Sequence, residues 1–273
     1  MLTHQDKTEI GLGLRRSFAV DLVGNPDNKI DFLEIAPENF IGSGGKFFDA
    51  FEKLSGVYPL VAHGLTVACG NDHLDWDYLK KLKAFLKKYS FKYFTDHLCL
   101  SGFQNNHFHD LIPLPFNKAV AKQVAANAKV IQDFLELPLG LENISYYAQP
   151  YESEMTEVEF VSCVLEESGV SLMLDINNVY VNSFNHHYDA KKFIDVMVHF
   201  PIIQCHMAGH IQRSEDLIID SHGEAIIDPV WDLLHYYGRK RGSSAPIVLE
   251  RDHNIPPLSE LIVEIEKIRS ILN

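Results

Sequence analysis

Eight short apolar runs constrain this chain most, because they recur along its length with longer amphipathic stretches between them. The runs are rich in β-branched and aromatic residues, and most end at a polar residue. They span residues 9–14, 31–36, 58–64, 92–98, 137–144, 171–177, 202–209 and 245–251. Near-continuous apolar strands that alternate with helices are typical of a parallel sheet covered on both faces. Eight such units of roughly 30 residues predict a single (β/α)8 TIM barrel, an α/β domain over residues 1–273.

The stretches between the runs have helical periodicity. Residues 74–89 place Leu79, Leu82 and Phe85 at helical spacing with lysines opposite, and residues 117–136 and 258–272 also read as helices. The chain has 273 residues, of which 46% are hydrophobic, enough for the core of one such barrel. No Ser/Gly linker or low-complexity tract marks a domain boundary.

Charge and cysteine content exclude several classes of function. A formal net charge of -13 should repel phosphate backbones and anionic lipids, so we expect neither a nucleic-acid nor a membrane partner. The N-terminus lacks the pattern of a signal peptide, and no apolar run approaches the roughly 18 residues of a membrane helix, so we expect a cytoplasmic protein. The four cysteines are far apart without a CxxC pair, which predicts reduced, structural thiols.

Ionisable side chains stand at or near the ends of the third to eighth predicted strands. They are His63, His97, Glu142, Asp175, His206 and Glu250. The active site of a TIM barrel is built from the carboxyl ends of its strands, so these residues should converge. A single residue of this kind is usually an incidental polar group at a strand end. Six in register would repel one another or lose solvation unless divalent cations satisfied them, which predicts a metal centre.

Strand parity and ligand chemistry support this prediction. If His206 points into the barrel, Cys205 and Met207 point outward, and if Glu142 points inward, Leu139 and Leu141 point outward. Three imidazoles with three carboxylates form a nitrogen and oxygen ligand set, which suits Fe, Mn, Zn or Co. We predict Glu142, Asp175 and Glu250 as catalytic residues as well as ligands.

The segment after the seventh strand has further candidate ligands. Asp220 and His222 lie two residues apart, so in an extended segment both side chains would point to one face and form part of another metal site; an ordinary turn is the alternative. His210 has no assigned role. Asn177 and Asn178 are candidate carbonyl ligands, and Asn143 and Asn39 are candidate hydrogen-bond partners of ligands.

Two acidic residues after the second strand keep several possible roles. Glu34 and Glu38 read as substrate contacts, hydrogen-bond partners of ligands, a general base or a solvated loop. The sequence has no Ser/His/Asp triad signature, no GxxxxGK[ST] phosphate loop and no GxGxxG fingerprint.

Nine short motifs in this order resemble one known family, the multinuclear iron-dependent oxidases that include MbnB of methanobactin biosynthesis and the cysteine-processing protein TglH. The motifs are GLGLR, FLEIAPENF, VAHGLT, TDHLCLSG, GLENISYY, LDINNVYVN, HMAGH, IDSHG and VLERD. The resemblance covers nearly the whole chain. It implies a TIM barrel of the xylose-isomerase-like superfamily with two or three iron ions.

The resemblance also implies roles for individual residues. His63, His97 and Glu142 resemble the ligands of a first iron, and Glu142 would bridge to a second iron held by Asp175, His206 and Glu250. Asp220 and His222, with Asn178, resemble a third, more labile site. Relatives use dioxygen to oxidise cysteines of a ribosomally made precursor peptide, usually with a small partner protein that presents the peptide. Thiolate binding at one iron, dioxygen activation at another and hydrogen abstraction from the cysteine side chain would follow.

Two other functions stay open. A redox-neutral hydrolase or sugar isomerase using Zn, Mn or Mg needs similar ligands, although an isomerase also needs a lysine near the metal and no strand-end lysine is evident. A non-catalytic metal-binding or peptide-carrying protein would close the metal site with protein ligands, whereas a catalytic site keeps a position open.

Overall fold

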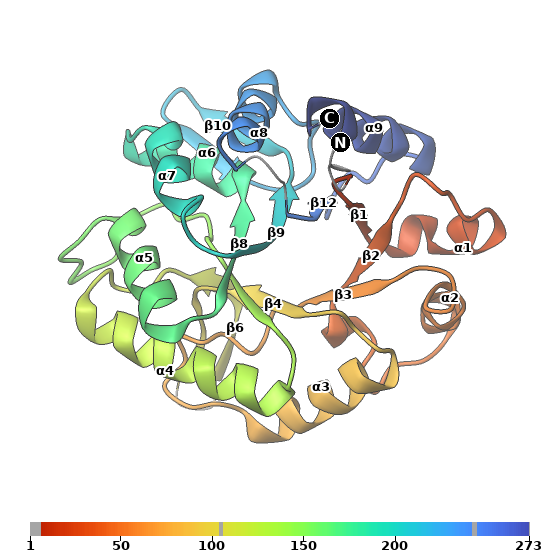
Figure 1. Cartoon of the computed structure of the whole chain (residues 1–273), viewed down its shortest axis with the longest axis horizontal. Coiled ribbons are helices and arrows are strands. Elements are labelled where there is room, and N and C mark those ends of the chain that lie inside the picture. The colour runs from red at the N-terminus through yellow and green to blue at the C-terminus, as the bar shows by residue number, and fades with distance from the viewer. Residues whose placement is uncertain (1–6, 104–105, 242–244, 273) are drawn as a thin grey trace, which may run out of the picture.

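The computed structural model describes residues 7–103, 106–241 and 245–272, which form a barrel of parallel strands inside a ring of helices (Figure 1). The strands close in the order β1-β12-β9-β8-β7-β4-β3-β2. In chain order they are β1 (Ile10–Gly13), β2 (Phe32–Ile35), β3 (Leu60–His63), β4 (Phe94–His97), β7 (Leu139–Glu142), β8 (Ser171–Asp175), β9 (Ile202–Met207) and β12 (Ile247–Leu249). Each lies within one of the eight apolar runs, so the predicted barrel is confirmed.

The helices cover the outer face of the barrel. They are α1 (Arg16–Gly24), the short helix η1 (Pro37–Asn39), α2 (Lys46–Leu54), α3 (Trp76–Lys88), α4 (Lys118–Leu135), α5 (Glu157–Ser168), α6 (Ile176–His186), α7 (Ala190–Met197), α8 (Asp228–Arg241) and α9 (Leu258–Leu272). In α3, Asp75 caps the first turn through the N–H groups of Asp77 and Tyr78. Leu79 and Leu82 form part of the face that α3 buries.

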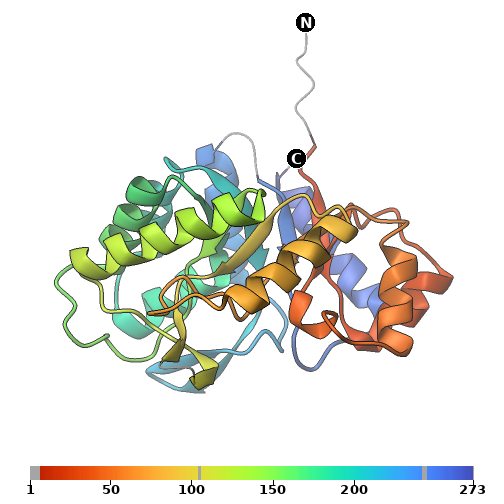
Figure 2. The same cartoon turned by 90° about the horizontal axis from the view of Figure 1, so that it is seen from below.

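Two hairpins extend the barrel, and the sequence did not predict either of them. One is β5 (Leu100–Phe103) with β6 (Asn106–Ile112), which follows β4, and the other is β10 (His210–Ser214) with β11 (Leu217–Asp220), which follows β9. Both lie at the lower end of the barrel in Figure 2, opposite the end at which β1 begins. They therefore flank the carboxyl ends of the strands, where a barrel of this type has its active site.

Side chains alternate between the lumen and the outer core, as the parity of the strands predicts. Cys205, Met207, Leu139 and Leu141 are buried in the main apolar core with the helices. Phe32, Val61, Tyr93 and Val248 form a separate cluster. These four residues have the parity of the inward-facing side chains, so we assign them to the lumen, where they close its amino end.

Strand β1 leaves the lumen open on its side, because its inward positions are glycines. A Cβ at Gly11 would overlap the ring of Phe32, and one at Gly13 would lie 2.8 Å from the guanidinium of Arg15. The space is therefore available to side chains from the neighbouring elements.

The four cysteines are free, as predicted, and all but Cys163 are buried. Among the described residues, no helix is both long and apolar enough to cross a membrane.

Candidate metal centre

Strand register brings the predicted ligands to the same level of the barrel. His97 on β4 pairs with Glu142 on β7, and Asp175 on β8 pairs with His206 on β9. His63 ends β3, and Glu250 directly follows β12. All six predicted residues are buried at the carboxyl end of the barrel.

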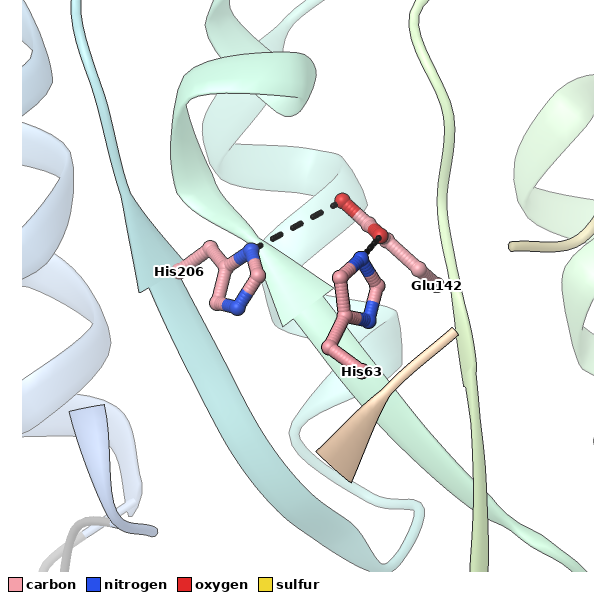
Figure 3. A group of neighbouring side chains, drawn as sticks. All are labelled: His63, Glu142 and His206. Atoms are coloured by element: carbon pink, nitrogen blue, oxygen red, sulfur yellow. Dashed lines mark ion pairs between the residues drawn. The ribbon is translucent and has the colours of Figure 1, made fainter. Parts of the chain in front are cut away.

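Glu142 lies at the centre of this group. Its Oε2 is 3.2 Å from Nε2 of both His63 and His97, and its Oε1 is 4.0 Å from Nδ1 of His206. Figure 3 shows His63 and His206 reaching toward Glu142 from separate strands. One ligand atom from each of these three residues lies within 4.8 Å of the others, which is close enough for all three to hold one ion.

Hydrogen bonds determine which nitrogen each histidine presents to Glu142. The Thr95 hydroxyl donates to the Ala62 carbonyl, so it accepts from Nδ1 of His63 at 2.9 Å. Nδ1 of His97 donates to the Gly64 carbonyl at 3.1 Å. In the neutral form that binds a metal, both rings would therefore keep their proton on Nδ1 and direct the lone pair of Nε2 toward the Glu142 carboxylate.

His206 presents its other nitrogen, and Glu34 is the reason. The Tyr93 hydroxyl donates to Oε1 of Gln204, which leaves the Gln204 amide to donate to Oε2 of Glu34 at 2.5 Å. Nε2 of His206 lies 2.8 Å from the same Glu34 oxygen and donates to it. In the neutral ring, the lone pair of Nδ1 would then be directed at the ligand group. Such a carboxylate partner fixes the orientation and raises the basicity of a metal-binding histidine.

The structure distinguishes Glu34, which contacts a candidate ligand, from Glu38, which does not. Glu34 is buried within β2, so the loop alternative is wrong for it, and it orients His206. Glu38 accepts hydrogen bonds from the N–H of Leu65 and the hydroxyl of Tyr78, apart from the ligand group. Asn39 is exposed and has no side-chain hydrogen bond within the described residues, so its predicted role is wrong.

A second group continues from His206 across the barrel mouth. Oε2 of Glu250 is 2.9 Å from Nδ1 of His206 and 3.1 Å from Nδ1 of His222. Nε2 of His222 is 2.7 Å from Oδ1 of Asp220. Asp175, His222 and Glu250 form another set whose ligand atoms lie within 4.8 Å. His222 follows β11 with φ +49°, so the extended geometry expected around it is wrong, but its side chain still meets Asp220.

The asparagines predicted near the site connect it to its surroundings. Asn143 exchanges hydrogen bonds with the backbone of Asp175, whose Oδ1 caps α6 through the N–H of Asn178. Asn177 accepts from Nδ1 of His210 and donates to Asp220, which gives His210 a place beside the second group. The Nδ2 group of Asn178 lies 3.4 Å from Oε1 of Glu142.

Several buried side-chain atoms of the site have no hydrogen-bond partner. Within the described residues, five such side-chain atoms lie here: Oε2 of Glu142, Oδ2 of Asp175, Oδ1 of Asn178, Nδ1 of His206 and Nε2 of His222. Four of them, all but Oδ1 of Asn178, lie within 4.0 Å of an atom of an oppositely ionisable side chain without a hydrogen bond to it. Two ligand atoms of one cation lie close together, but each points at the cation and not at the other ligand. The arrangement seen here therefore fits metal binding. Leaving such atoms unsatisfied would otherwise be costly.

The buried carboxylates of the candidate metal centre also carry negative charge that needs to be balanced. Burial alone would lower the pKa of His97, but the carboxylates of Glu142 and Asp96 raise it to about 9. Burial would raise the pKa of Glu142, but His97 and His63 lower it to about 2. Burial and the charge of Glu142 raise the pKa of Asp175. The carboxylates outnumber the permanent cations around them, so protons or metal ions must balance the charge.

Two charged residues of the site escaped the sequence analysis. The guanidinium of Arg15 contacts Glu250 at 3.3 Å and Asp252 at 2.5 Å, and Asp252 accepts from Nδ1 of His222. Arg15 directly follows the predicted strand 9–14 and Asp252 directly follows the predicted strand 245–251, so both stood at predicted strand ends. Thr95 and Gln204 were also missed, although each precedes a predicted ligand by two residues and so shares its face of the strand.

A sequence profile for the RiPP precursor modification enzymes MbnB/TglH/ChrH matches residues 9–273. RiPPs are ribosomally synthesised and post-translationally modified peptides. The chain is 44% identical over 265 residues to a UPF0276 protein of Shewanella sediminis, covering 96% of this chain and 94% of the relative. It is 42% identical over 262 residues to a UPF0276 protein of Pseudomonas aeruginosa, covering 96% and 91%. The resemblance inferred from the motifs is confirmed.

Solved structures share the fold at low identity. The 3-keto-D-glucoside 4-epimerase YcjR of E. coli superposes with a TM-score of 0.61 at 12% identity, over 97% of this chain and 100% of the epimerase. A xylose isomerase-like TIM barrel protein of Mycobacterium smegmatis in complex with magnesium has a TM-score of 0.58 at 9% identity, over 94% and 89%. These similarities establish the fold alone, so the function has to be inferred from the residues of the site.

Proposed function

Because this chain belongs to the family of RiPP precursor modification enzymes, we propose that it is a multinuclear iron enzyme that uses dioxygen to oxidise cysteine residues of a precursor peptide. One observation carries the proposal: imidazole nitrogens of His63, His97 and His206 converge on the buried Glu142. A mixed nitrogen and oxygen ligand set of this kind suits iron.

Each residue has a defined place in this proposal. His63, His97 and Glu142 would hold one ion, and Asp175, His206 and Glu250 a second, with Glu142 between them. Asp220, His222 and Asn178 would hold a third. Bound iron would supply a position for the cysteine thiolate and electrons for dioxygen. A small partner protein that presents the peptide is part of the proposal.

The chain's own groups prepare the site before any substrate arrives. Thr95, the Gly64 carbonyl and Glu34 each contact the ring nitrogen of one histidine that faces away from the ligand group, and so orient its ring. Burial of the ligand atoms keeps bulk water away from them, which strengthens every electrostatic interaction inside. Arg15 supplies a permanent positive charge beside Glu250 and Asp252.

A second candidate function is a redox-neutral sugar isomerase or epimerase that uses a divalent metal. It is favoured by the fold shared with YcjR. Within the part of the chain that the structure describes, however, no lysine pairs with the acidic residues of the cluster, and an isomerase of this type would need one.

Metal analysis separates these functions. We expect anaerobically purified protein to contain two or three iron ions per chain by elemental analysis, with mixed-valent signals by Mössbauer spectroscopy. His73→Ala is a control, because the His73 side chain is 83% exposed and should not affect metal content. Zinc or manganese alone, with no activity after iron reconstitution, would favour the isomerase.

The activity itself is tested with a candidate substrate. Each short cysteine-containing peptide encoded near this gene would be incubated with iron-loaded protein and dioxygen, with and without any small protein encoded nearby, and its mass followed. A mass change confined to fragments that contain cysteine supports the proposal, whereas an unchanged peptide in both reactions contradicts it.

A further inference from the structure

Strand β10 exposes one edge of its hairpin at the barrel mouth. Its residues Ile211–Ser214 are exposed, whereas His210 is only 8% exposed. An open strand edge presents unpaired N–H and C=O groups to which another extended chain can bind, and proteins usually cover or block such an edge. In this hairpin the edge of β11 is covered, whereas the edge of β10 is open.

The edge on the β11 side is capped by side chains. Asn185 of α6 accepts from the N–H of Ile218 and donates to its carbonyl, and the N–H of Asp220 donates to the Tyr147 hydroxyl. The backbone groups of Ile218 and Asp220 therefore point away from β10.

The register then determines where the groups of β10 point. Gln212 pairs with Ile218, and His210 pairs with Asp220. In an antiparallel ladder, the backbone N–H and C=O groups of two opposite residues either hydrogen bond to each other or, in both residues, point away from the partner strand. The N–H and C=O groups of Gln212 and His210 must point to the open side, and neither residue's backbone has a hydrogen-bond partner among the residues that the structure describes.

The open edge leads from the surface to the candidate metal centre. From Gln212 to His210 the strand passes from exposed to buried. At its inner end, His210 connects through Asn177 to Asp220, whose Oδ1 lies 2.7 Å from Nε2 of His222. An extended peptide laid along this edge would therefore run toward the barrel mouth, where the second ligand group lies.

We propose that the free edge of β10 binds the precursor peptide as an added strand and directs its cysteine to the metal centre. This inference rests on the proposed function. Because the contacts are to backbone groups, binding would tolerate changes in most peptide side chains, and the length between the bound segment and the cysteine would select the site of reaction.

The test compares Gln212→Pro with Gln212→Ala. Proline removes the N–H group that points to the open side, a change that an edge strand tolerates, while alanine keeps it. The probe is a fluorophore-labelled peptide, taken from the short cysteine-containing peptides encoded near this gene, with iron-loaded protein kept anaerobic so that no turnover occurs. We expect Gln212→Pro to weaken binding about tenfold, and Gln212→Ala to change it less than about twofold.

Hydrogen exchange supplies a readout that needs no substitution. Saturating peptide should slow exchange of the Gln212 amide, whereas the Ile211 amide, bonded within the hairpin, should exchange slowly throughout. Equal peptide affinity of wild type and Gln212→Pro, or unchanged exchange at Gln212, would overturn the proposal. Protection of Gln212 by self-association of the chain would also overturn it. If the wild type binds but never modifies the peptide, the proposed function fails and the docking surface stands.

Discussion

Replacing Glu34 tests whether an outer carboxylate prepares His206 for metal binding. Glu34 is 2% exposed and accepts from Nε2 of His206 at 2.8 Å and from the Gln204 amide at 2.5 Å. Glu34→Gln keeps the shape and an oxygen acceptor but removes the charge. Glu34→Ala removes both, so the pair of variants separates charge from hydrogen bonding.

The magnitude follows from what each variant leaves behind. Loss of a hydrogen-bond partner of a metal ligand typically lowers metal affinity 10- to 100-fold, or about 1.4 to 2.8 kcal/mol. We expect Glu34→Gln near the lower limit and Glu34→Ala near the upper one. Glu34→Ala also leaves two buried donors, on His206 and Gln204, without an acceptor, which should lower the free energy of unfolding of the metal-free protein by about 2 kcal/mol or more.

The assay is an anaerobic titration with Fe(II) against a competing chelator, repeated with Zn(II), together with urea unfolding of the metal-free protein. Glu38→Gln is the matched control, because Glu38 hydrogen bonds to Leu65 and Tyr78 instead of a candidate ligand. Its metal affinity should stay within about threefold of wild type. Wild-type affinity in both Glu34 variants would refute the argument that Glu34 orients His206.

Three further predictions concern other parts of the chain. Glu142→Ala should remove at least one metal equivalent by elemental analysis while circular dichroism still reports a folded barrel, and full metal content would rule out its bridging role. The double variant Asp220→Ala/His222→Ala should keep two metals and lose a third, and retention of all three would leave Asp220 and His222 without a metal role. Burial raises the pKa of Glu157 to about 7, so its contribution to the free energy of unfolding, full below about pH 4.5, should fall as pH rises through 7. Glu157→Gln should therefore be more stable than wild type at pH 8, by up to about 3 kcal/mol in urea unfolding, and an equal pH dependence of both proteins would contradict this.

Much of the ligand group was predictable because strands obey a simple alternation. Strand parity placed His206 and Glu142 inward and their neighbours outward. Because the carboxyl ends of all eight strands lie at one end of the barrel, the candidate ligands there were expected to meet. The same alternation places Thr95 and Gln204, two residues before predicted ligands, on the inward face of their strands. The two hairpins were not predictable in this way, because they follow strands β4 and β9 at the mouth without the long apolar runs that mark buried strands.

The sequence by itself determined the eight strands, the helices between them and the set of candidate ligands, because apolar periodicity and strand-end chemistry are local properties. Only the tertiary structure decided which nitrogen each histidine presents. That choice depends on Glu34, which meets His206 from 172 positions away along the chain. It also decided that Arg15 reaches Glu250 past the glycines of β1, since closure of the barrel brings the first and last strands together. Contacts of this kind leave no periodic trace in the sequence, because each requires two distant residues to meet.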